Sequence, residues 1–371
     1  MGVTESILAF DTVALDYTTD ESGVQKPCLK IIDQTKLPGK LEFLSLSGSG
    51  EIREAIYRLK VRGAPAIGVA AAIGIYIIAN NIETDNFKEF EAEFTAAKET
   101  LASSRPTAVN LSWALERMAK VVRSGSCSGP GPCPEKIVAA VKALLLDEAL
   151  KIRDEDVAAC RKIGEHGLSL IRNGDGILTH CNAGQLAAVK YGTALAPVHL
   201  GRERGFQFKV YVDETRPLLQ GARLTAFELA AAGVDATLIC DNMVSQVMKN
   251  GWVQAVFTGC DRMAANGDAC NKIGTSAVAI LARHYKIPFY VCLPVSTIDM
   301  NIKTGADIVI EQRDPSEVTE MWYREPMAPA GVKVFNPAFD VTGHELITAV
   351  ITERGIARPP YFSAIDQLFI R

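Results

Sequence analysis

The feature that most constrains the fold is a regular alternation, in the second half of the chain, of short apolar runs with helical stretches. Each run has the length and composition of a buried strand, and the residues after it have the apolar spacing of a helix. The runs are GILTH at 176–180, FKVYVD at 208–213, ATLICD at 236–241, VQAVFTG at 253–259, PFYVCL at 288–293 and DIVIE at 307–311. Strands that alternate with helices form parallel βαβ units. We therefore predict an α/β fold with a parallel sheet.

The first half of the chain has a different pattern, in which helical spacing dominates. Strand-like residues occur at 29–32 and 41–44. The expected helices cover residues 49–59, 64–79, 87–101, 108–122 and 137–171. A chain of 371 residues is too long for one core, because a domain usually contains about 150 residues. We therefore expect two domains.

The composition argues against several classes of protein. A net charge of -4 lacks the basic excess that binds nucleic acid or an anionic membrane. The start of the chain has neither the basic nor the continuously apolar segment of a secretory signal, so we expect a cytoplasmic protein. The most apolar segment, residues 64–79, is shorter than the ~20 residues that cross a bilayer, and we interpret it as a buried helix. The expected partner is a small molecule or another protein.

Metal sites, disulfide scaffolds and nucleotide cofactors are not expected. The nine cysteines contain no CxxC pair, and the five histidines form no cluster with metal-ligand spacing. We interpret His180 as a strand-end residue that orients its neighbours. No Walker loop and no strand-linked GxGxxG is present. The Gly- and Pro-rich segment 124–134 is interpreted as a surface insertion. Its Cys127 and Cys133 could form a metal or redox pair, but because no histidine or carboxylate accompanies them we assign them no function.

Polar residues that follow the predicted strands are the best candidates for function, because ligands bind at the carboxyl ends of parallel strands. Cys181 follows the run 176–180, next to an expected helix start that would lower the pKa of its thiol. Simple packing is the alternative for this cysteine. The segment Asp213–Leu224 combines acids, arginines and Gln220, which suit a polyhydroxylated phosphate ester. A solvated loop with surface ion pairs would have the same composition.

Further along the chain, Asp261 follows the run 253–259. Partial burial at the end of an apolar strand would raise the pKa of this carboxyl group and make it a general acid. A helix N-cap or an ion pair with Arg262 is the alternative. Asn271 and Lys272 lie at an expected helix start, where N–H groups and an ammonium group together bind phosphate. Asp241 is adequately explained as an N-cap.

Two arginines in the first half also precede expected helices. Arg62 begins the segment Arg62–Gly68, and Arg105 begins Arg105–Asn110. Several basic helix starts in one chain indicate a shared anion, because each start offers free N–H groups and partial positive charge. Phosphate is the natural candidate.

These residues lie in motifs by which the chain resembles the methylthioribose-1-phosphate isomerase family. The wider family includes ribose-1,5-bisphosphate isomerases and regulatory subunits of a translation initiation exchange factor. The motifs are RGAPAIG at 62–68, RPTAVNL at 105–111, THCNAGQL at 179–186, DETRPLLQGARL at 213–224, GCDRMAANGDACNKIG at 259–274, FNPAFDVT at 335–342 and ITERG at 351–355. They are spread over most of the chain, and THCNAG together with DRMAANGD and NKIG is highly specific.

The resemblance implies a small N-terminal domain, expected at 1–145, and a Rossmann-like catalytic domain, expected at 146–371. It also implies a homodimer with the active site in the cleft between the domains. By resemblance, Cys181 and Asp261 are the catalytic residues. The implied substrate-binding residues are Arg62, Gly63, Ala64, Arg105, Gln220, Asn271 and Lys272.

The implied activity is conversion of 5-methylthioribose 1-phosphate to 5-methylthioribulose 1-phosphate, a step of methionine salvage that calls for neither metal nor nicotinamide. Asp261 would protonate the ring or carbonyl oxygen, and Cys181 would take the C2 proton or stabilise the transition state. An enediol and a hydride shift both fit. Two alternatives remain open: isomerisation of 5-deoxyribose 1-phosphate or ribose 1,5-bisphosphate, and a non-catalytic regulatory subunit. Subunits of the second kind are expected to lack the full catalytic pair.

Overall fold

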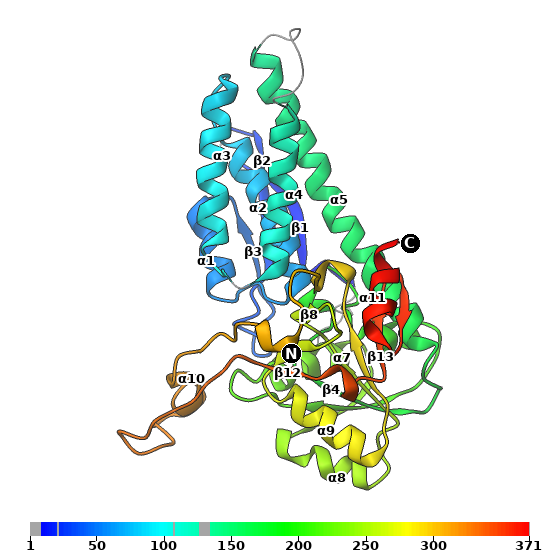
Figure 1. Cartoon of the computed structure of the whole chain (residues 1–371). Coiled ribbons are helices and arrows are strands. Elements are labelled where there is room, and N and C mark those ends of the chain that lie inside the picture. Colours follow the sequence, from blue (N-terminus) through cyan, green and yellow to red (C-terminus); the bar gives the residue numbers. More distant parts are fainter. Residues whose placement is uncertain (1–8, 21, 107, 126–133, 371) are drawn as a thin grey trace. The chain divides into compact units, whose positions relative to one another are not determined.

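The computed structural model describes residues 9–20, 22–106, 108–125 and 134–370, so most of the predicted insertion at 124–134 lies outside the described residues. The chain forms two compact units (Figure 1). The N-terminal unit consists of Leu8–Ala159 and Gln185–Lys190, and the C-terminal unit contains Cys160–Gly184 and Tyr191–Arg371. The predicted division into residues 1–145 and 146–371 stays a prediction.

The N-terminal unit combines an antiparallel sheet with long helices. Its strands are β1 (Val13–Thr19), β2 (Gln25–Ile32) and β3 (Phe43–Leu46), in the order β1-β2-β3. Its helices are α1 (Ser49–Tyr57), α2 (Ala64–Asn80), α3 (Phe87–Ala102), α4 (Val109–Gly125) and most of α5 (Pro134–Leu168). The predicted helices are confirmed to within a few residues. Strand β1 was not predicted, because the sequence VALDYTT exposes its second half and lacks a continuous apolar run.

Helix α2 is the centre of the N-terminal unit because it is apolar on all sides. It contacts α3, α4 and the strands β1 and β2 (Figure 1). Close approach to α4 depends on Gly68, since a Cβ atom there would lie 3.1 Å from the carbonyl oxygen of Asn110. Helices α2 and α4 therefore begin side by side. No helix in the described ranges is both long and apolar enough to cross a membrane.

The C-terminal unit is built on a large sheet that is parallel except at one edge. In the described residues its order is β14-β13-β10-β7-β4-β5-β6, with only β14 antiparallel to its neighbour. The strands are β4 (Gly176–His180), β5 (Lys209–Asp213), β6 (Asp235–Ile239), β7 (Ala255–Thr258), β10 (Phe289–Cys292), β13 (Ala349–Thr352) and β14 (Gly355–Ala357). The predicted α/β fold class with a parallel sheet in the C-terminal part is thus confirmed.

Helices and a second small sheet complete the C-terminal unit. The helices are α6 (Ala196–Glu203), α7 (Ala226–Ala231), α8 (Val244–Lys249), α9 (Thr275–Tyr285), α10 (Ser316–Thr319) and α11 (Tyr361–Ile370), and Gly221–Thr225 forms one π-helical turn. The small sheet has the order β11-β8-β9-β12, from β11 (Ile298–Asp299), β8 (Arg262–Ala264), β9 (Ala269–Lys272) and β12 (Phe339–Thr342). Figure 1 shows α8 and α9 side by side and the segment around α10 extending away from the sheets of its unit.

One predicted strand was wrong. The run 307–311 is not a strand: a capping box of Thr304 and Asp307 turns the chain there, and Val309 is exposed. The strand that pairs with β10 at this side of the sheet is instead β13, which contains the first residues of the ITERG motif. An apolar run alone cannot distinguish a strand from an extended connection, because sheet pairing is decided by distant residues.

Candidate active site

The predicted catalytic residues follow two neighbouring strands of the large sheet. Strand β4 lies between β7 and β5, and the last residues of β4 and β7, His180 and Thr258, are paired. Cys181 comes directly after His180, and Asp261 comes soon after Thr258. Because the two strands are parallel, their carboxyl ends meet at one edge of the sheet. The fold therefore brings Cys181 and Asp261 to the same edge, as the sequence predicts.

The backbone of Cys181 is held in an unusual conformation. Its φ angle is 66°, in the left-handed region that a residue with a side chain enters at a cost of about 1–2 kcal/mol. The Cys181 N–H group donates to the hydroxyl oxygen of Thr215 at 2.8 Å, and the Thr225 hydroxyl donates to the Cys181 carbonyl oxygen at 2.7 Å. Both polar backbone groups of this buried residue are thus fixed by neighbouring threonines, which the sequence did not single out.

The expected helix start beside Cys181 is wrong. The residues that follow form a single 3-10 turn, η2 (Gln185–Ala187), and the next helix, α6, begins only at Ala196. The sequence LAAVKYG has helical composition, but Gly192 forms an isolated bridge with Gly184 and interrupts the helical path. A helix dipole is therefore not what would activate the thiol.

Asp261 lies at the start of the hairpin formed by β8 and β9. Its N–H group donates to the carbonyl oxygen of Cys270 at 2.9 Å, and its side chain is partly exposed. Since a strand and not a helix follows it, the N-cap alternative is wrong. The neighbouring thiols do not compete for a catalytic role: burial raises the pKa of Cys260 well above its ordinary value and raises the pKa of Cys270 to about 12.

Gln220 is the substrate-binding candidate with the clearest structural signal in the C-terminal unit. It lies at the entry to the π-helical turn and is 5% exposed. Its side-chain oxygen has no hydrogen-bond partner among the described residues. A buried acceptor of this kind costs about 1–3 kcal/mol unless a donor reaches it, and a sugar hydroxyl group is such a donor.

Other polar groups of the segment Asp213–Leu224 have structural partners. Asp213 is fully buried and contacts His180. The Arg216 guanidinium donates to the Val318 carbonyl oxygen at 2.8 Å, and the Arg223 guanidinium lies 4.9 Å from the centre of the Trp322 ring. Asp213 is thus engaged with His180 inside the protein, and the contacts of Arg216 and Arg223 orient their guanidinium groups; the alternative of a solvated loop does not fit the buried Asp213.

Asn271 and Lys272 belong to strand β9 and not to a helix start, so that part of the prediction was wrong. Helix α9 begins at Thr275, and the carboxylate of Asp340 accepts the N–H groups of Gly274 and Ser276 at 2.8 and 3.1 Å. The protein's own carboxylate thus occupies the place where a phosphate was expected. Sequence gave no signal for this contact beyond the presence of Asp340 in the FNPAFDVT motif.

Side-chain contacts nevertheless fix both β9 residues in place. The Asn271 amide donates to the Thr275 hydroxyl oxygen at 3.0 Å. The Lys272 ammonium group donates to the Ala338 carbonyl oxygen at 2.8 Å and lies 4.4 Å from the centre of the Phe339 ring. An ammonium group has three donors, so these contacts orient Lys272 and leave it able to bind an anion.

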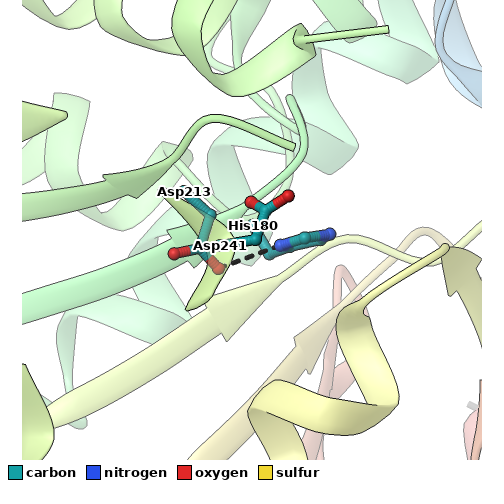
Figure 2. Close-up of side chains that lie close together, drawn as sticks. All are labelled: His180, Asp213 and Asp241. Atoms are coloured by element: carbon teal, nitrogen blue, oxygen red, sulfur yellow. Dashed lines mark hydrogen bonds and ion pairs between the residues drawn. The ribbon is translucent and has the colours of Figure 1, made fainter. Parts of the chain in front are cut away.

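A buried cluster of His180, Asp213 and Asp241 lies at the ends of β4, β5 and β6 (Figure 2). His180 Nδ1 is 2.9 Å from an Asp213 carboxylate oxygen, and Nε2 is 2.8 Å from the Ile273 carbonyl oxygen. Asp241 accepts the N–H groups of Thr215 and Arg216, so its predicted N-cap role is wrong. Each ring nitrogen of His180 thus faces a hydrogen-bond partner.

The charges of this cluster support one another. Burial alone would lower the pKa of His180, but the hydrogen bond and charge of Asp213, with the charge of Asp241, raise it above its ordinary value. Burial raises the pKa of Asp213 to about 6, against the opposing effect of His180. The imidazolium form of His180 and the ionised form of Asp213 therefore stabilise each other.

In the N-terminal unit, the other predicted residues gather at one end of two helices. Arg62 and Gly63 precede α2, Ala64 begins it, and Arg105 precedes the adjoining start of α4. Gly63 has a φ angle of 91°, and a Cβ atom there would lie 2.5 Å from the Cα atom of Ala187. Two aligned helix starts with an arginine each form the basic, N–H-rich arrangement that the sequence indicated for an anion.

Two hollows in the described residues lie elsewhere. One, of about 370 Å³, is bordered by Lys209 and Asp235, the first residues of β5 and β6, and so lies at the amino ends of these strands. The other, of about 460 Å³, lies in the N-terminal unit beside Phe10, Phe43 and Arg153. Neither is bordered by a predicted site residue.

The fold and the strand-end residues are those of a two-unit α/β protein with a parallel sheet. Residues 60–359 match the Initiation factor 2 subunit family. The chain belongs to this family, and the resemblance inferred from the motifs is confirmed.

Similar proteins include isomerases of sugar phosphates. Methylthioribose-1-phosphate isomerase from Symbiobacterium thermophilum is 62% identical over 353 residues, which are 95% of each chain. A 5-deoxyribose 1-phosphate isomerase from Petrotoga mobilis is 54% identical over 341 residues, 92% of this chain and 96% of that protein. The crystal structure of 5-methylthioribose 1-phosphate isomerase from Pyrococcus horikoshii has a TM-score of 0.86 and 42% identity, and covers 98% of this chain and 97% of its own.

Proposed function

We propose that the protein is an aldose–ketose isomerase that converts 5-methylthioribose 1-phosphate to 5-methylthioribulose 1-phosphate. The observation that carries this function is the placement of Cys181 and Asp261 after the paired ends of β4 and β7. The 62% identity with a protein of this name over nearly the whole chain supports it. The activity is an intramolecular oxidation and reduction, in which C2 of the sugar is oxidised and C1 is reduced.

The chemical difficulty is that a phosphate on C1 keeps the sugar ring closed. During the reaction the bond between C1 and the ring oxygen breaks, and the ring oxygen takes a proton to become a hydroxyl group. A hydrogen moves from C2 to C1, and the C2 hydroxyl group loses its proton to become a ketone. The site therefore needs an acid for the ring oxygen and a group that assists at C2.

Asp261 and Cys181 match these two requirements. Asp261 comes off an apolar strand and is partly shielded from water, an environment that favours a protonated carboxyl group. Cys181 is 7% exposed, on a turn fixed by two threonine hydroxyl groups. We assign Asp261 the acid role at the ring or carbonyl oxygen, and Cys181 the role of C2 base or transition-state stabiliser.

The remaining predicted residues supply the groups that a sugar phosphate requires. The Lys272 ammonium group, the arginines Arg62 and Arg105, and the starts of α2 and α4 are suited to the phosphate. The Gln220 side-chain oxygen and the Asn271 amide are suited to the hydroxyl groups of the sugar. We propose that each of these residues binds the sugar phosphate, with Gly63 and Ala64 providing close backbone approach.

The second candidate substrate is 5-deoxyribose 1-phosphate, which lacks the methylthio group. The relative from Petrotoga mobilis, which bears that name at 54% identity, favours it as the alternative. Ribose 1,5-bisphosphate would require a further basic cluster for its second phosphate, and the sequence offers no obvious one. Homodimeric assembly and a cytoplasmic location stay predictions, and light scattering of the purified protein tests the first.

The test of substrate class is a panel of 1-phosphorylated pentoses assayed with the purified full chain. The proposal predicts the highest kcat/KM with 5-methylthioribose 1-phosphate, lower values with 5-deoxyribose 1-phosphate, and the lowest with ribose 1,5-bisphosphate. A higher kcat/KM with the deoxy sugar would reassign the substrate. Absence of turnover with every member, combined with copurification of heteromeric partners, would instead favour the regulatory subunit.

Turnover in deuterated water separates the two mechanisms. Solvent deuterium at C1 of the product means that a proton leaves C2 and exchanges before it reaches C1, as an enediol requires. Complete retention of the substrate hydrogen is the result that a hydride shift predicts. The same assay with C2-deuterated substrate in ordinary water is the matched control.

A further inference from the structure

The His180 side chain connects two sheets of the C-terminal unit at the predicted catalytic edge. It is the last residue of β4, directly before Cys181, and is 1% exposed. One ring nitrogen contacts Asp213 at the end of β5 (Figure 2). The other contacts the carbonyl group of Ile273, just after β9. Its ring therefore links the large sheet to the strand that holds Asn271 and Lys272.

The chain makes room for this ring with a glycine. A Cβ atom at Gly274 would lie 2.8 Å from His180 Cε1 and 3.0 Å from Nε2, closer than packed carbon atoms approach. Gly274 has a φ angle of 102°, and its N–H group is bound by Asp340. The His180 ring is thus placed beside β9 by its contact with the Ile273 carbonyl group and by the space that Gly274 leaves for it.

The hydrogen-bond partners determine how many protons the ring carries. The Ile273 carbonyl oxygen can only accept, so Nε2 must donate. While Asp213 is ionised, its carboxylate oxygen can only accept, so Nδ1 must donate as well. A neutral imidazole has a single N–H group and would leave one bond unmade, whereas an imidazolium makes both. Negative charge surrounds the ring, because Asp213, Asp241 and Asp340 all interact electrostatically with it, and Glu214 acts on Asp213.

Cys181 depends on the same cluster through its backbone. Its N–H group donates to the Thr215 hydroxyl oxygen, and the Thr215 N–H group donates in turn to Asp241 at 2.8 Å. The Thr215 hydroxyl group donates to the Asp213 carbonyl oxygen at 3.0 Å. The residues that surround His180 are thus the residues that fix the turn of the candidate catalytic thiol.

We propose that His180 is a positioning residue of the isomerase site, whose imidazolium group holds the Cys181 turn and the Asn271–Lys272 strand in fixed register through Asp213 and Ile273. This inference rests on the proposed function. It assigns His180 no contact with substrate. Its effect is to keep the thiol and the ammonium group at a constant separation, because misplacement of reacting groups by about 1 Å can cost a factor of 100 in rate.

The first test is nitrogen-15 NMR of the histidine side chains in the wild-type chain. At about pH 8 an ordinary histidine is neutral and has one ring N–H group. We expect one histidine with two protonated ring nitrogens, absent in His180→Gln and present in the control His166→Gln. A spectrum in which every histidine is a neutral tautomer would overturn the proposal, and this result does not depend on any variant folding or on any activity.

The second test is the kinetics of His180→Gln with 5-methylthioribose 1-phosphate. We expect kcat/KM to fall by roughly 10- to 100-fold, through both a lower kcat and a higher KM, since both the thiol and the phosphate-binding strand shift. His166→Gln, whose ring also contacts a backbone carbonyl group, serves as the matched control with near-normal kinetics. Wild-type kinetics in His180→Gln would refute the positioning role while leaving the isomerase function intact. An inactive wild type would refute the function instead.

Discussion

At the scale of the residue, the turn of Cys181 shows how neighbouring side chains define a candidate catalytic group. The left-handed backbone of this residue persists because Thr215 and Thr225 bind its N–H and carbonyl groups. Two threonine hydroxyl groups from distant parts of the chain therefore set the position of the Cys181 turn.

Replacement of Thr215 tests this dependence. Thr215→Val keeps the shape of the side chain but leaves the buried Cys181 N–H group without its acceptor, so we expect a loss of about 1–2 kcal/mol of unfolding free energy and a lower kcat. Thr258→Val is the matched control, because the Thr258 hydroxyl group at the end of β7 is buried without a hydrogen-bond partner among the described residues. Chemical denaturation measures the unfolding free energy of the two variants, and steady-state kinetics measures their kcat. Equal effects in the two variants would contradict the role of Thr215 in fixing the Cys181 turn.

Gly63 provides a second test at this scale. Gly63→Ala places a methyl group against the backbone of Ala187 and an L side chain at positive φ, and we expect it to cost about 2–4 kcal/mol of unfolding free energy. Gly23→Ala is the control that measures the cost of a positive φ angle alone. Gly23 has a φ angle of 84°, but no atom of the described chain lies within 4 Å of its added Cβ. Thermal unfolding should show a larger loss of stability for Gly63→Ala than for Gly23→Ala. Similar losses in the two variants would contradict the close packing of Gly63 against Ala187.

At the scale of the element, helix α5 and the segment Gln185–Lys190 are joined by a carboxyl group. Asp156 of α5 accepts the N–H group of Val189 at 2.8 Å. Burial raises the pKa of Asp156 to about 7, against the opposing effect of this hydrogen bond. The folded state therefore holds a proton here more tightly than the unfolded chain does.

The contribution of Asp156 to the unfolding free energy decreases as the pH rises. Because the folded pKa lies above the unfolded value, the contribution of Asp156 to stability is present at low pH and is lost as the pH rises toward about 7. Asp156→Asn imitates the protonated form. We therefore expect its unfolding free energy, relative to that of wild type, to increase by about 1–2 kcal/mol from about pH 5 to about pH 8. Denaturant unfolding at the two pH values measures the gain, with the exposed Asp154→Asn as control. A constant difference would contradict this prediction.

Secondary-structure elements were predictable where local pattern alone decides them. Helix α2 and strands β4 and β7 are fixed by long apolar runs. The expected helix after Cys181 failed because Gly184 and Gly192 form a bridge that helical spacing does not contain. The expected strand at 307–311 failed because the capping box of Thr304 and Asp307, a local signal, outweighs the apolar run.

The candidate site was predictable to a similar degree. Strand-end position identified Cys181, Gln220 and Asp261 directly from the residues. Two contacts escaped prediction because they join residues far apart in sequence. They are the bond of the Asp340 carboxylate to Gly274 before α9 and the bond of Thr215 to Cys181.

At the scale of the whole molecule, the predicted substrate-binding residues come from both compact units. Lys272 and Gln220 belong to the C-terminal unit, and Arg62 and Arg105 to the N-terminal unit. The chain itself passes from one unit to the other between Gly184 and Gln185, within the motif that contains Cys181.

Loss of a basic side chain that binds phosphate is expected to weaken substrate binding. We expect Lys272→Met and Arg62→Met each to raise KM for 5-methylthioribose 1-phosphate by about 10- to 100-fold, because each removes a charge-assisted hydrogen bond to phosphate. Arg58→Met, at an exposed ion pair with Glu54, is the control and should leave KM unchanged. An unchanged KM in either test variant would remove that residue from the site.

The most direct test of the account is the turnover of Cys181→Ser and Asp261→Asn with 5-methylthioribose 1-phosphate, measured beside the control Cys240→Ser at the end of β6. We expect each of the first two variants to lower kcat by about 100-fold or more, with unfolding temperatures near that of wild type. Cys240→Ser should retain normal kcat. Near-normal turnover in either Cys181→Ser or Asp261→Asn would contradict the assignment of these two residues as the catalytic pair.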